Sequence, residues 1–360
     1  MIRRISMAAA AAAAMLLFTS CGNDAAEQPT AETEAAVTEA AAVTDMTIEE
    51  KVAQLFMVRC DDANMDAILE KQPGGIVMFG VDFEGLTKDE VKDKIESYKD
   101  ACVIEPIISV DEEGGTVVRV SSNPNLAGEK YQNPRYYYEL GGIEALAQNA
   151  AEKSDLLADL GITMNLAPVA DVSTDPDDFI YDRALGEDAA TTAEYVSAVV
   201  GAMKEHGMMS CLKHFPGYGG NVDTHTGIAI DDRPLDSFYE NDFVPFEAGI
   251  EAGADAVLVA HNIVNSIDST QPASISGPVH EILREELGYD GIIMTDDMSM
   301  EAMAQYETPY TKAVLAGNDM VIVTDFEAAY NEVLGAVKDG TIPESTIDAA
   351  VERILEAKGY

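Results

Sequence analysis

The feature that most constrains the fold is a regular alternation of short apolar runs with amphipathic helical patterns, from Asp45 to Tyr360. The helical patterns carry start signals, such as the capping-box spacing of Thr87 and Glu90. The apolar runs have the length and continuous hydrophobicity of strands that are buried on both faces. The runs that fit are Gly75–Phe79, Pro106–Val110, Ile162–Leu166, Met208–Leu212, Ala256–Ala260, Gly291–Thr295 and Asp319–Val323. The alternation predicts a parallel sheet with helices packed outside it.

Ionisable residues follow most of these predicted strands at one end. They are Asp111, Asp171, Lys213, His214, His261, Asp296, Asp297 and Asp325. In a closed barrel the carboxyl ends of all strands meet at one mouth, whereas a doubly wound open sheet spreads such residues along a crevice. Closure is favoured, so we expect an α/β fold, a TIM-type (β/α)8 barrel, as one domain over residues 45–360. An eighth strand is not identifiable, since Ile48, Val52, Leu55 and Phe56 fall on one face of a predicted helix.

The N-terminal segment predicts export. A basic start precedes an apolar run, Met7–Phe18, that is too short to span a bilayer, so residues 1–20 are interpreted as a signal peptide. Cys21 follows small residues as in bacterial lipoprotein signals, so we expect lipidation of Cys21 and a disordered tether over residues 21–44. The domain would then lie in the cell envelope, extracellular or periplasmic, and touch the membrane only through its lipid anchor. An ordinary cleaved secretion signal with an incidental cysteine is the alternative.

Composition excludes several classes of function. The formal net charge is −43, whereas a nucleic-acid binder needs a basic face, and charge-driven adhesion to anionic lipid is excluded for the same reason. Cys60, Cys102 and Cys211 lie beside apolar residues at predicted strand or helix ends, so we expect buried free thiols. No spacing of cysteines or histidines fits a zinc site.

Two segments carry the residues best suited to chemistry. The first runs from Lys213 through a glycine-rich loop to Asp223 and His225, which point to the same side if the chain is extended. A carboxylate beside an imidazole suits proton transfer near neutral pH, although a turn capped by Asp223 is the alternative. The second places Asp296 and Asp297 at a strand end, where we expect only one to face the mouth, unless both cap a following helix.

These segments resemble glycoside hydrolase family 3, and within it the β-N-acetylglucosaminidase branch. The matching motifs keep their order along the chain: Gly74–Phe79 (GGIVMF), Asp111–Gly115 (DEEGG), Asn165–Val172 (NLAPVADV), Asp182–Gly186 (DRALG), Lys213–Gly219 (KHFPGYG), Asp223–His225 (DTH) and Thr295–Met300 (TDDMSM). The sequence departs from the branch at Tyr218, where the branch has histidine, and at Thr116, where it has arginine. The resemblance covers nearly the whole predicted domain and implies its barrel fold.

The resemblance also implies the roles of individual residues. Asp296 would be the nucleophile and His225 the acid/base, assisted by Asp223. The residues that would bind the hydroxyls of the terminal sugar are Asp111, Arg183, Lys213 and His214, and His261 would line the mouth. Positive charge on Lys213 and Arg183 is expected to keep Asp296 ionised.

The implied reaction is hydrolysis of terminal, non-reducing β-N-acetylglucosamine from peptidoglycan fragments or other N-acetylhexosaminides. It would proceed with retention through a glycosyl-aspartate intermediate. No cofactor and no metal are implied, the partner is the carbohydrate substrate, and we expect a monomer. The β-glucosidase branch takes its acid/base from a second domain. Since Tyr360 directly follows the last predicted helix, the sequence favours the N-acetylglucosaminidase branch.

Three alternatives remain open at this point. A β-N-acetylglucosaminide phosphorylase on the same fold would use phosphate as acceptor, which a histidine acid/base repels less than a carboxylate would. A non-catalytic sugar-binding lipoprotein would share the signal, the lipidated cysteine and the tether. A metal-dependent barrel hydrolase would need closely paired histidine ligands, which the five histidines do not supply.

Overall fold

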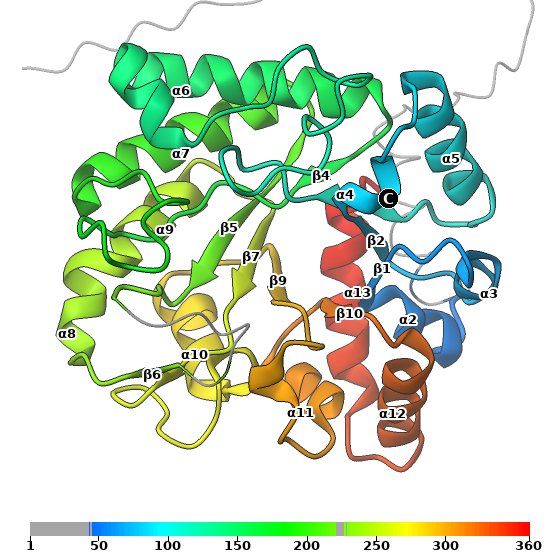
Figure 1. Cartoon of the computed structure of the whole chain (residues 1–360). Helices are drawn as coiled ribbons and strands as arrows, with labels where there is room; N and C mark the ends of the chain where they lie inside the picture. Colours follow the sequence, from blue (N-terminus) through cyan, green and yellow to red (C-terminus); the bar gives the residue numbers. More distant parts are fainter. Residues whose placement is uncertain (1–42, 44, 221–226, 228) are drawn as a thin grey trace, which may run out of the picture.

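The fold is an eight-stranded parallel sheet that curves almost into a closed barrel, with helices around it (Figure 1). The structure is a computed structural model that describes Val43, residues 45–220, Gly227 and residues 229–360. The strands follow one another as β10-β1-β2-β3-β4-β5-β7-β9. Their bounds are β1 Phe56–Arg59, β2 Gly75–Met78, β3 Ile107–Val110, β4 Met164–Asn165, β5 Met209–Phe215, β7 Ala256–Val259, β9 Ile292–Thr295 and β10 Val321–Val323. The predicted barrel class is therefore confirmed.

The strand that the sequence did not reveal is β1. Helix α2 (Ile48–Gln54) ends before Leu55, and Phe56 begins the strand, so the predicted extension of the helix through Phe56 is wrong. Phe56, Met57 and Val58 pair with β10 on one side, and β1 pairs with β2 on the other. Periodicity alone does not separate a short buried strand from the last turn of a buried helix, which explains the error. A separate two-stranded parallel sheet, β6 (Ile230–Asp231) with β8 (Ile263–Val264), was also not predicted.

The helices that surround the strands begin largely where the sequence signals them. Thr47 caps α2 and Thr87 caps α5, each with the reciprocal bonds of a capping box. The α-helices are α2, α3 (Met65–Glu70), α4 (Gly80–Phe83), α5 (Lys88–Asp100), α6 (Pro134–Asp159), α7 (Ala189–Glu205), α8 (Leu235–Ser237), α9 (Phe243–Glu251), α10 (Gly277–Glu281), α11 (Pro309–Ala316), α12 (Phe326–Lys338) and α13 (Glu344–Lys358). Short π or 3-10 turns are η2 (Phe238–Asp242), η3 (Ala273–Ile275), η4 (Ile282–Glu286) and η5 (Glu301–Met303).

The core has two layers, as alternation along the strands requires. In β1, Met57 points into the barrel, whereas Phe56 and Val58 point outward to the helices. The interior layer is filled by large side chains from nearly every strand, and Ile354 of α13 joins it. The barrel is therefore packed solid below its mouth, and a ligand can enter only at an end.

The barrel closes between β9 and β10, which share one isolated bridge, Met294 with Met320, and a few backbone bonds, such as that from the Thr295 amide to the Met320 carbonyl oxygen at 3.2 Å. Side chains supplement it. The Asp319 carboxylate accepts bonds from the Ile293 amide at 2.8 Å and from Arg353 at 2.9 Å, and the Thr295 hydroxyl accepts from the Ile322 amide at 3.1 Å. Side-chain bonds therefore complete this seam.

Cys60, Cys102 and Cys211 are free thiols. Cys60 and Cys211 are buried, as predicted, whereas Cys102 is only half-buried. In the described part of the chain, no helix has the length and apolar character needed to cross a membrane. The predicted signal peptide, Cys21 and nearly all of the tether lie outside the described residues.

Candidate active site

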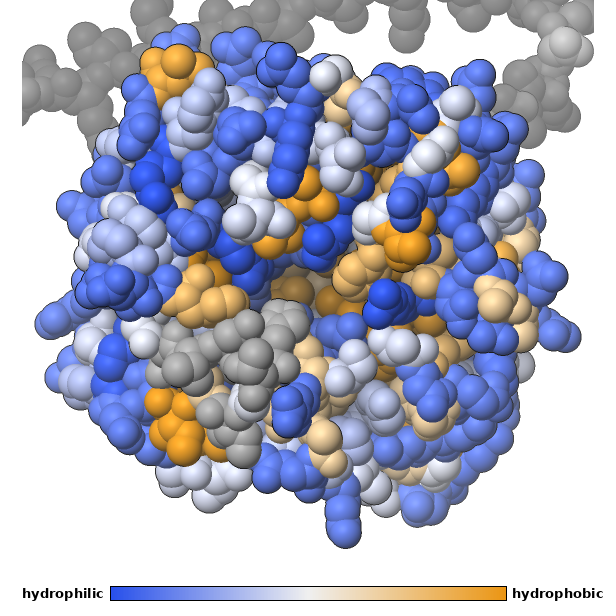
Figure 2. Space-filling view, viewed as in Figure 1, coloured by the Kyte–Doolittle hydropathy of each residue, from blue (hydrophilic) through white to orange (hydrophobic). Residues whose placement is uncertain are grey.

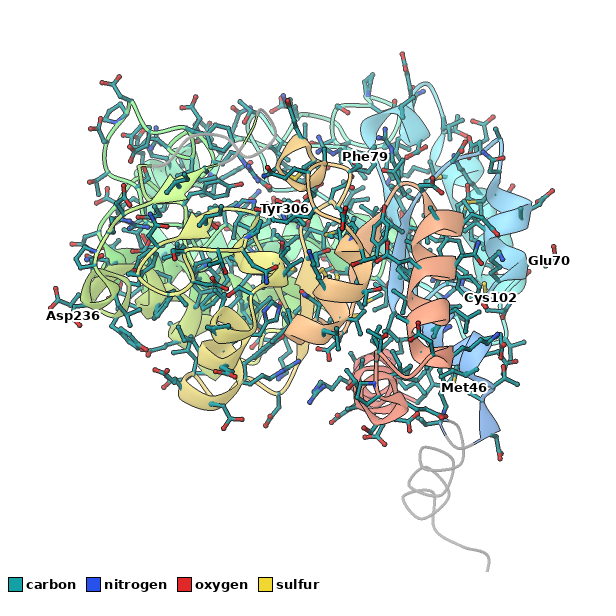
Figure 3. The ribbon with its side chains drawn as sticks, turned by 90° about the horizontal axis from the view of Figure 1, so that it is seen from below. Met46, Glu70, Phe79, Cys102, Asp236 and Tyr306 are labelled. Atoms are coloured by element: carbon teal, nitrogen blue, oxygen red, sulfur yellow. The ribbon has the colours of Figure 1, made fainter. Side chains whose placement is uncertain are left out.

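A pocket of about 150 Å³ opens at the carboxyl ends of the barrel strands. This face of the molecule is hollowed near its centre (Figure 2). The pocket is lined by Val77, Phe79, Asp111, Val117, Arg119, Leu166, Arg183, Lys213, His214, Leu258, Asp296, Asp297 and Ile322. In the perpendicular view, Phe79 lies near one edge of the molecule and Met46 near the opposite edge (Figure 3). The pocket is therefore at the end of the barrel where catalytic groups of this fold are built.

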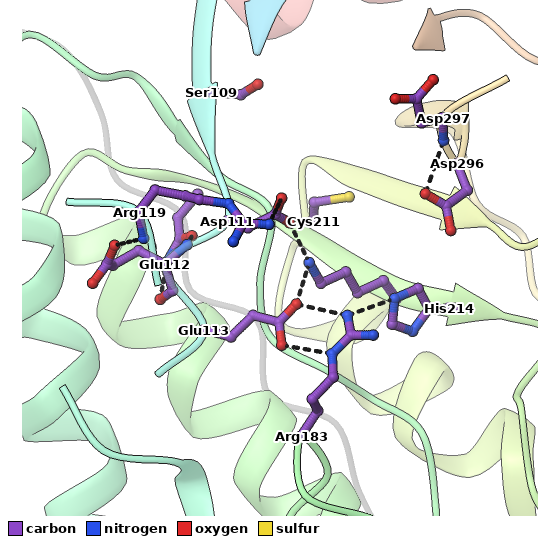
Figure 4. A network of polar contacts seen from close by, with 12 residues as sticks. Ser109, Asp111, Glu112, Glu113, Arg119, Arg183, Cys211, His214, Asp296 and Asp297 are labelled. Atoms are coloured by element: carbon purple, nitrogen blue, oxygen red, sulfur yellow. Dashed lines mark hydrogen bonds and ion pairs between the residues drawn. The ribbon is translucent and has the colours of Figure 1, made fainter. Parts of the chain in front are cut away.

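Lys213 is the centre of the charged floor of the pocket, and Figure 4 shows its partners Asp111 and Glu113. Its Nζ lies 2.6 Å from an oxygen of Asp111, which follows β3, and 2.6 Å from an oxygen of Glu113. The Lys213 side chain is only 2% exposed. Burial lowers the pKa of Lys213, but the charges of Asp111 and Glu113 outweigh burial and raise that pKa above its usual value. Lys213 is therefore charged and fixed.

Lys213 and His214 are consecutive, yet both line the pocket. In a regular strand their side chains would point to opposite faces. The pairing of β5 with β7 shifts register between Lys213 and Phe215, and such an irregularity re-aims a side chain. This local departure from strand geometry brings two predicted site residues together.

Arg183 and His214 form the second half of the charged network. Arg183 donates two bonds to Glu113, at 3.0 and 2.8 Å, and its Nη2 lies 3.0 Å from His214 Nε2. Because a guanidinium only donates, His214 Nε2 is the acceptor and Nδ1 carries the proton, donated to Asp171 at 2.8 Å. Burial raises the pKa of Glu113, but Arg183 and Lys213 outweigh it and hold the pKa well below its usual range.

Both cations therefore bond to Glu113, and Lys213 also bonds to Asp111. Lys213 and Arg183 line the same pocket as Asp296, and the expectation that their charges keep Asp296 ionised stays a prediction. Glu113 was not among the predicted site residues, although the DEEGG motif contains it. Gly114 fixes its place, since φ is +112° and an added Cβ would lie 2.0 Å from the Gln132 carbonyl oxygen.

Arg119 is a second lining residue that the sequence reasoning did not identify. Its Nη2 lies 3.3 Å from Asp111, and its guanidinium lies 5.4 Å from the centre of the Phe79 ring. Its Nε is buried and has no hydrogen-bond partner among the described residues. A buried donor without a partner is costly, so the Arg119 guanidinium is only partly satisfied by these residues. The only available signal was a basic residue eight positions after Asp111.

Asp296 and Asp297 both line the pocket, and their carboxylates point in opposite directions, that of Asp296 on the side of His214 (Figure 4), so the expectation that only one faces the mouth stays a prediction. Both lie beyond Thr295, the last residue of β9, where strand alternation no longer applies. Asp296 accepts a bond from the Asp297 amide at 2.8 Å, and Asp297 accepts one from the Ser299 amide at 2.9 Å. No helix begins at Ser299, so neither residue caps one there.

His261 does not reach the pocket. It is fully buried, with Nδ1 2.7 Å from the Ser274 hydroxyl and Nε2 3.0 Å from the Asp297 carbonyl oxygen. The resemblance implied that His261 lines the mouth, but the structure does not place it among the residues that line the pocket. It supports the backbone that carries Asp297 instead.

Asp223 and His225 lie outside the described residues. The chain that leads to them is fixed at Gly217, whose carbonyl oxygen accepts a bond from Arg233 at 3.3 Å. Arg233 also pairs with Asp231 at 2.7 Å and Asp242 at 2.8 Å. Burial raises the pKa of Asp242 to about 7 despite the charge of Arg233. Tyr218, which departs from the family motif, is buried with its ring 5.1 Å from that of His214.

The described residues offer one grouping with the spacing of metal ligands, Cys60, Asp62 and Asp82. None of the three lines the pocket, and Lys94 already pairs with Asp62 at 2.8 Å. The pocket instead presents alternating carboxylates and cations, which accept from and donate to the hydroxyls of a sugar.

Such a pocket, at the carboxyl ends of eight parallel strands, defines a barrel enzyme that acts on a small polar substrate. Residues 47–357 match the family model described as "Glycosyl hydrolase family 3 N terminal domain". The chain belongs to glycosyl hydrolase family 3, as the motifs predicted.

Curated relatives and solved structures agree with this assignment. Beta-hexosaminidase LpqI of Mycobacterium tuberculosis is 31% identical over 325 residues, which cover 86% of this chain and 82% of the relative. The Beta-hexosaminidase of Hydrogenovibrio crunogenus is 31% identical over 288 residues, covering 78% and 80%. A glycoside hydrolase family 3 beta-N-acetylglucosaminidase from Paenibacillus sp. has a TM-score of 0.82 at 29% identity, covering 87% of this chain and 62% of that chain. The structure of M. tuberculosis LpqI has a TM-score of 0.81 at 28% identity, covering 89% and 96%.

Proposed function

We propose that this enzyme hydrolyses the glycosidic bond of a terminal, non-reducing β-N-acetylglucosamine. The observation that carries the proposal is the pocket in which Asp111, Arg119, Arg183 and Lys213 face Asp296. Its volume of about 150 Å³ is below the 300–1,000 Å³ typical of drug-sized ligands and suits one sugar unit. Relatives named beta-hexosaminidase, which align over most of the barrel, support the choice of sugar.

In the proposed mechanism, the Asp296 carboxylate attacks the anomeric carbon while the departing oxygen takes a proton from His225. The glycosidic bond breaks and a glycosyl-aspartate forms. His225 then takes a proton from water, the resulting hydroxide attacks the anomeric carbon, and the bond to Asp296 breaks. The sugar is released with its configuration retained. Asp223 orients the imidazole, and the fixed Lys213–Asp111 pair positions the sugar hydroxyls.

Two substitutions test these roles with 4-nitrophenyl and alkyl β-N-acetylglucosaminides. Asp296→Ala should lower kcat by at least about 10⁴-fold, as loss of a nucleophile does elsewhere. His225→Ala should lower kcat/KM, which reports the first step, by about 10²–10⁴-fold for the alkyl glycoside and by much less for the 4-nitrophenyl glycoside, because 4-nitrophenolate leaves without a proton. Asp297→Asn is the matched control and should retain most activity. Equal losses of kcat/KM for both glycosides would contradict His225 as the acid.

The same substrates separate the alternatives. If N-acetylglucosamine 1-phosphate were the main product in phosphate buffer, the enzyme would be a phosphorylase. If the wild-type protein bound the sugar without releasing 4-nitrophenol, it would be a binding protein.

We also propose that the chain is exported and anchored through a lipid on Cys21, and that it acts as a monomer in the cell envelope. The short apolar run before Cys21 supports export. Met46, near the start of the described domain, lies opposite the edge that bears Phe79, so the pocket would face away from the anchor. Fractionation of cells that express wild-type protein and Cys21→Ala tests this: the variant should leave the membrane fraction.

A further inference from the structure

Glu112 is a buried carboxylate whose three hydrogen bonds all come from backbone amides of one loop. Its side chain accepts from the amides of Arg119 at 2.8 Å, Val120 at 2.7 Å and Ser121 at 3.2 Å. The residue is 0% exposed. Figure 4 shows the bond between Glu112 and the Arg119 backbone. A carboxylate that accepts several amide bonds organises a loop more strongly than a neutral acceptor does.

The backbone of Glu112 is fixed as well, because it is bonded on both sides by one side chain. Asn165, at the end of β4, accepts from the Glu112 amide at 3.0 Å and donates to its carbonyl oxygen at 3.2 Å. Among the described residues, no lysine, arginine or histidine forms an ion pair with the Glu112 carboxylate; Lys153 donates to the Glu113 carbonyl oxygen instead. The three loop amides are therefore its hydrogen-bond partners.

The loop that Glu112 holds carries Arg119. That side chain has a single ion pair within the described chain, at 3.3 Å to Asp111, and its buried Nε has no partner. Its position at the pocket wall is therefore set mainly by its backbone, and the backbone amide of Arg119 is bonded to Glu112. A shift of about 1 Å in a positioning group is enough to weaken substrate binding or turnover by about 10²-fold.

We propose that Glu112 is a positioning residue for the substrate, and that it acts through Arg119. Its carboxylate fixes the backbone of residues 119–121 so that the Arg119 guanidinium meets both Asp111 and the bound sugar. The role rests on the hydrolase function proposed above. It concerns binding rather than bond cleavage, since Glu112 lies wholly beneath the pocket wall and does not line the pocket.

A double-mutant cycle tests the proposal in the full chain. Glu112→Gln preserves the shape but leaves one acceptor oxygen, and we expect KM for the 4-nitrophenyl substrate to rise about tenfold with kcat changed less than about twofold. Arg119→Ala should raise KM by about 10–100-fold. The double variant should equal Arg119→Ala alone, because the first substitution acts through the second residue. Additive losses, or an unchanged KM in folded Glu112→Gln, would overturn the proposal.

A matched control separates positioning from general destabilisation. Asp255 directly precedes β7, at the end of the strand away from the pocket. It is another carboxylate that accepts a hydrogen bond from a backbone amide, that of Ser210 at 2.8 Å. Asp255→Asn should lower the midpoint of urea unfolding while KM stays unchanged. If it raises KM as much as Glu112→Gln does, the effect of Glu112 is structural.

A second measurement does not depend on turnover. Phenylglyoxal modifies accessible arginines, and peptide mass spectrometry locates the modified residues. In Glu112→Gln, Arg119 should react several times faster than in the wild type, with Arg284 unchanged as an internal reference. An unchanged Arg119 rate overturns the proposal even if the wild type hydrolyses the substrate. If the wild type releases no 4-nitrophenol, the proposed hydrolase function is wrong. The rate at which phenylglyoxal modifies Arg119 still decides whether Glu112 positions that residue.

Discussion

Lys213→Met removes one ammonium group from the floor of the pocket and leaves the volume of the side chain nearly unchanged. The Nζ atom lies 2.6 Å from both Asp111 and Glu113, in a side chain that is 2% exposed. Removing one partner of a buried ion pair costs about 3–5 kcal/mol. Since Glu113 keeps Arg183 and Asp111 keeps Arg119, we expect the lower end, about 3 kcal/mol of unfolding free energy.

The expected loss has a defined dependence on pH. The pKa of Lys213 is raised from 10.5, so its stabilisation is fully present below that value and is lost as pH rises through the folded-state pKa. The pKa of Glu113 is lowered from 4.5, so the contribution of Glu113 to the free energy of unfolding is present above that value and is lost as pH falls through the folded-state pKa. The difference between wild type and variant should therefore be constant from about pH 5 to 10 and shrink outside that range.

Urea unfolding at several pH values measures the loss. Lys92→Met is the control, because Lys92 pairs with Asp159 at the same 2.6 Å but both side chains are over 40% exposed. It should cost below about 1 kcal/mol. In activity assays, Lys213→Met should lower kcat/KM by about 10–100-fold through the loss of a charged hydrogen bond at Asp111. A stability loss no larger than that of Lys92→Met would refute the argument that burial strengthens the Lys213 network.

Two further substitutions test the supports of the barrel. Burial lowers the pKa of Lys358 to about 7, so above that pH the unfolded state binds a proton that the folded state lacks, and the free energy of unfolding rises towards pH 10.5. Lys358→Met should flatten this rise when urea unfolding is measured at several pH values. An unchanged slope would contradict the lowered pKa of Lys358. In thermal unfolding, Gly217→Ala should lower the free energy of unfolding by at least about 2 kcal/mol, because φ is +116° and the new Cβ would lie 2.3 Å from Asp242. The control Gly340→Ala, where φ is +83° and the space for a Cβ is open, should lower it by only about 1 kcal/mol.

Most of the barrel was predictable because its strands are buried on both faces, which leaves continuous apolar runs in the sequence. The exception, β1, has the same composition, but the preceding helix is also buried. The apolar residues of helix and strand therefore merge into one pattern at Leu55 and Phe56. The β6–β8 pair is too short, with Ile230 and Asp231 on one strand, to leave any periodic signal.

The site was predictable where the motif itself carries the chemistry. Asp111, Arg183, Lys213, His214 and Asp296 meet in one pocket, as the resemblance implied. The partners of these residues depend on tertiary contacts that no local pattern encodes. Glu113 binds both Lys213 and Arg183, and the backbone amide of Arg119 is bonded to Glu112.

His261 shows the converse. It follows a strand as the other site residues do, yet its ring turns away from the pocket to meet Ser274 and the backbone of Asp297. Position at a strand end is therefore not sufficient for a place in the pocket, because the direction of the side chain beyond the strand also matters.

The seam between β9 and β10 gives the barrel one joint with different mechanics from the rest. Strands β1, β2 and β3 share regular ladders, whereas this joint has one isolated bridge, a few backbone bonds and side-chain bonds from Thr295 and Asp319. Asp296 follows directly after β9. A small opening of the joint would move Asp296 relative to Asp111 and Lys213 while the other strands keep their positions. We therefore expect the amide hydrogen of Ile322, which is bonded to the Thr295 hydroxyl, to exchange with solvent faster than those of β2 and β3, which would place a deformable joint of the barrel wall beside the nucleophile.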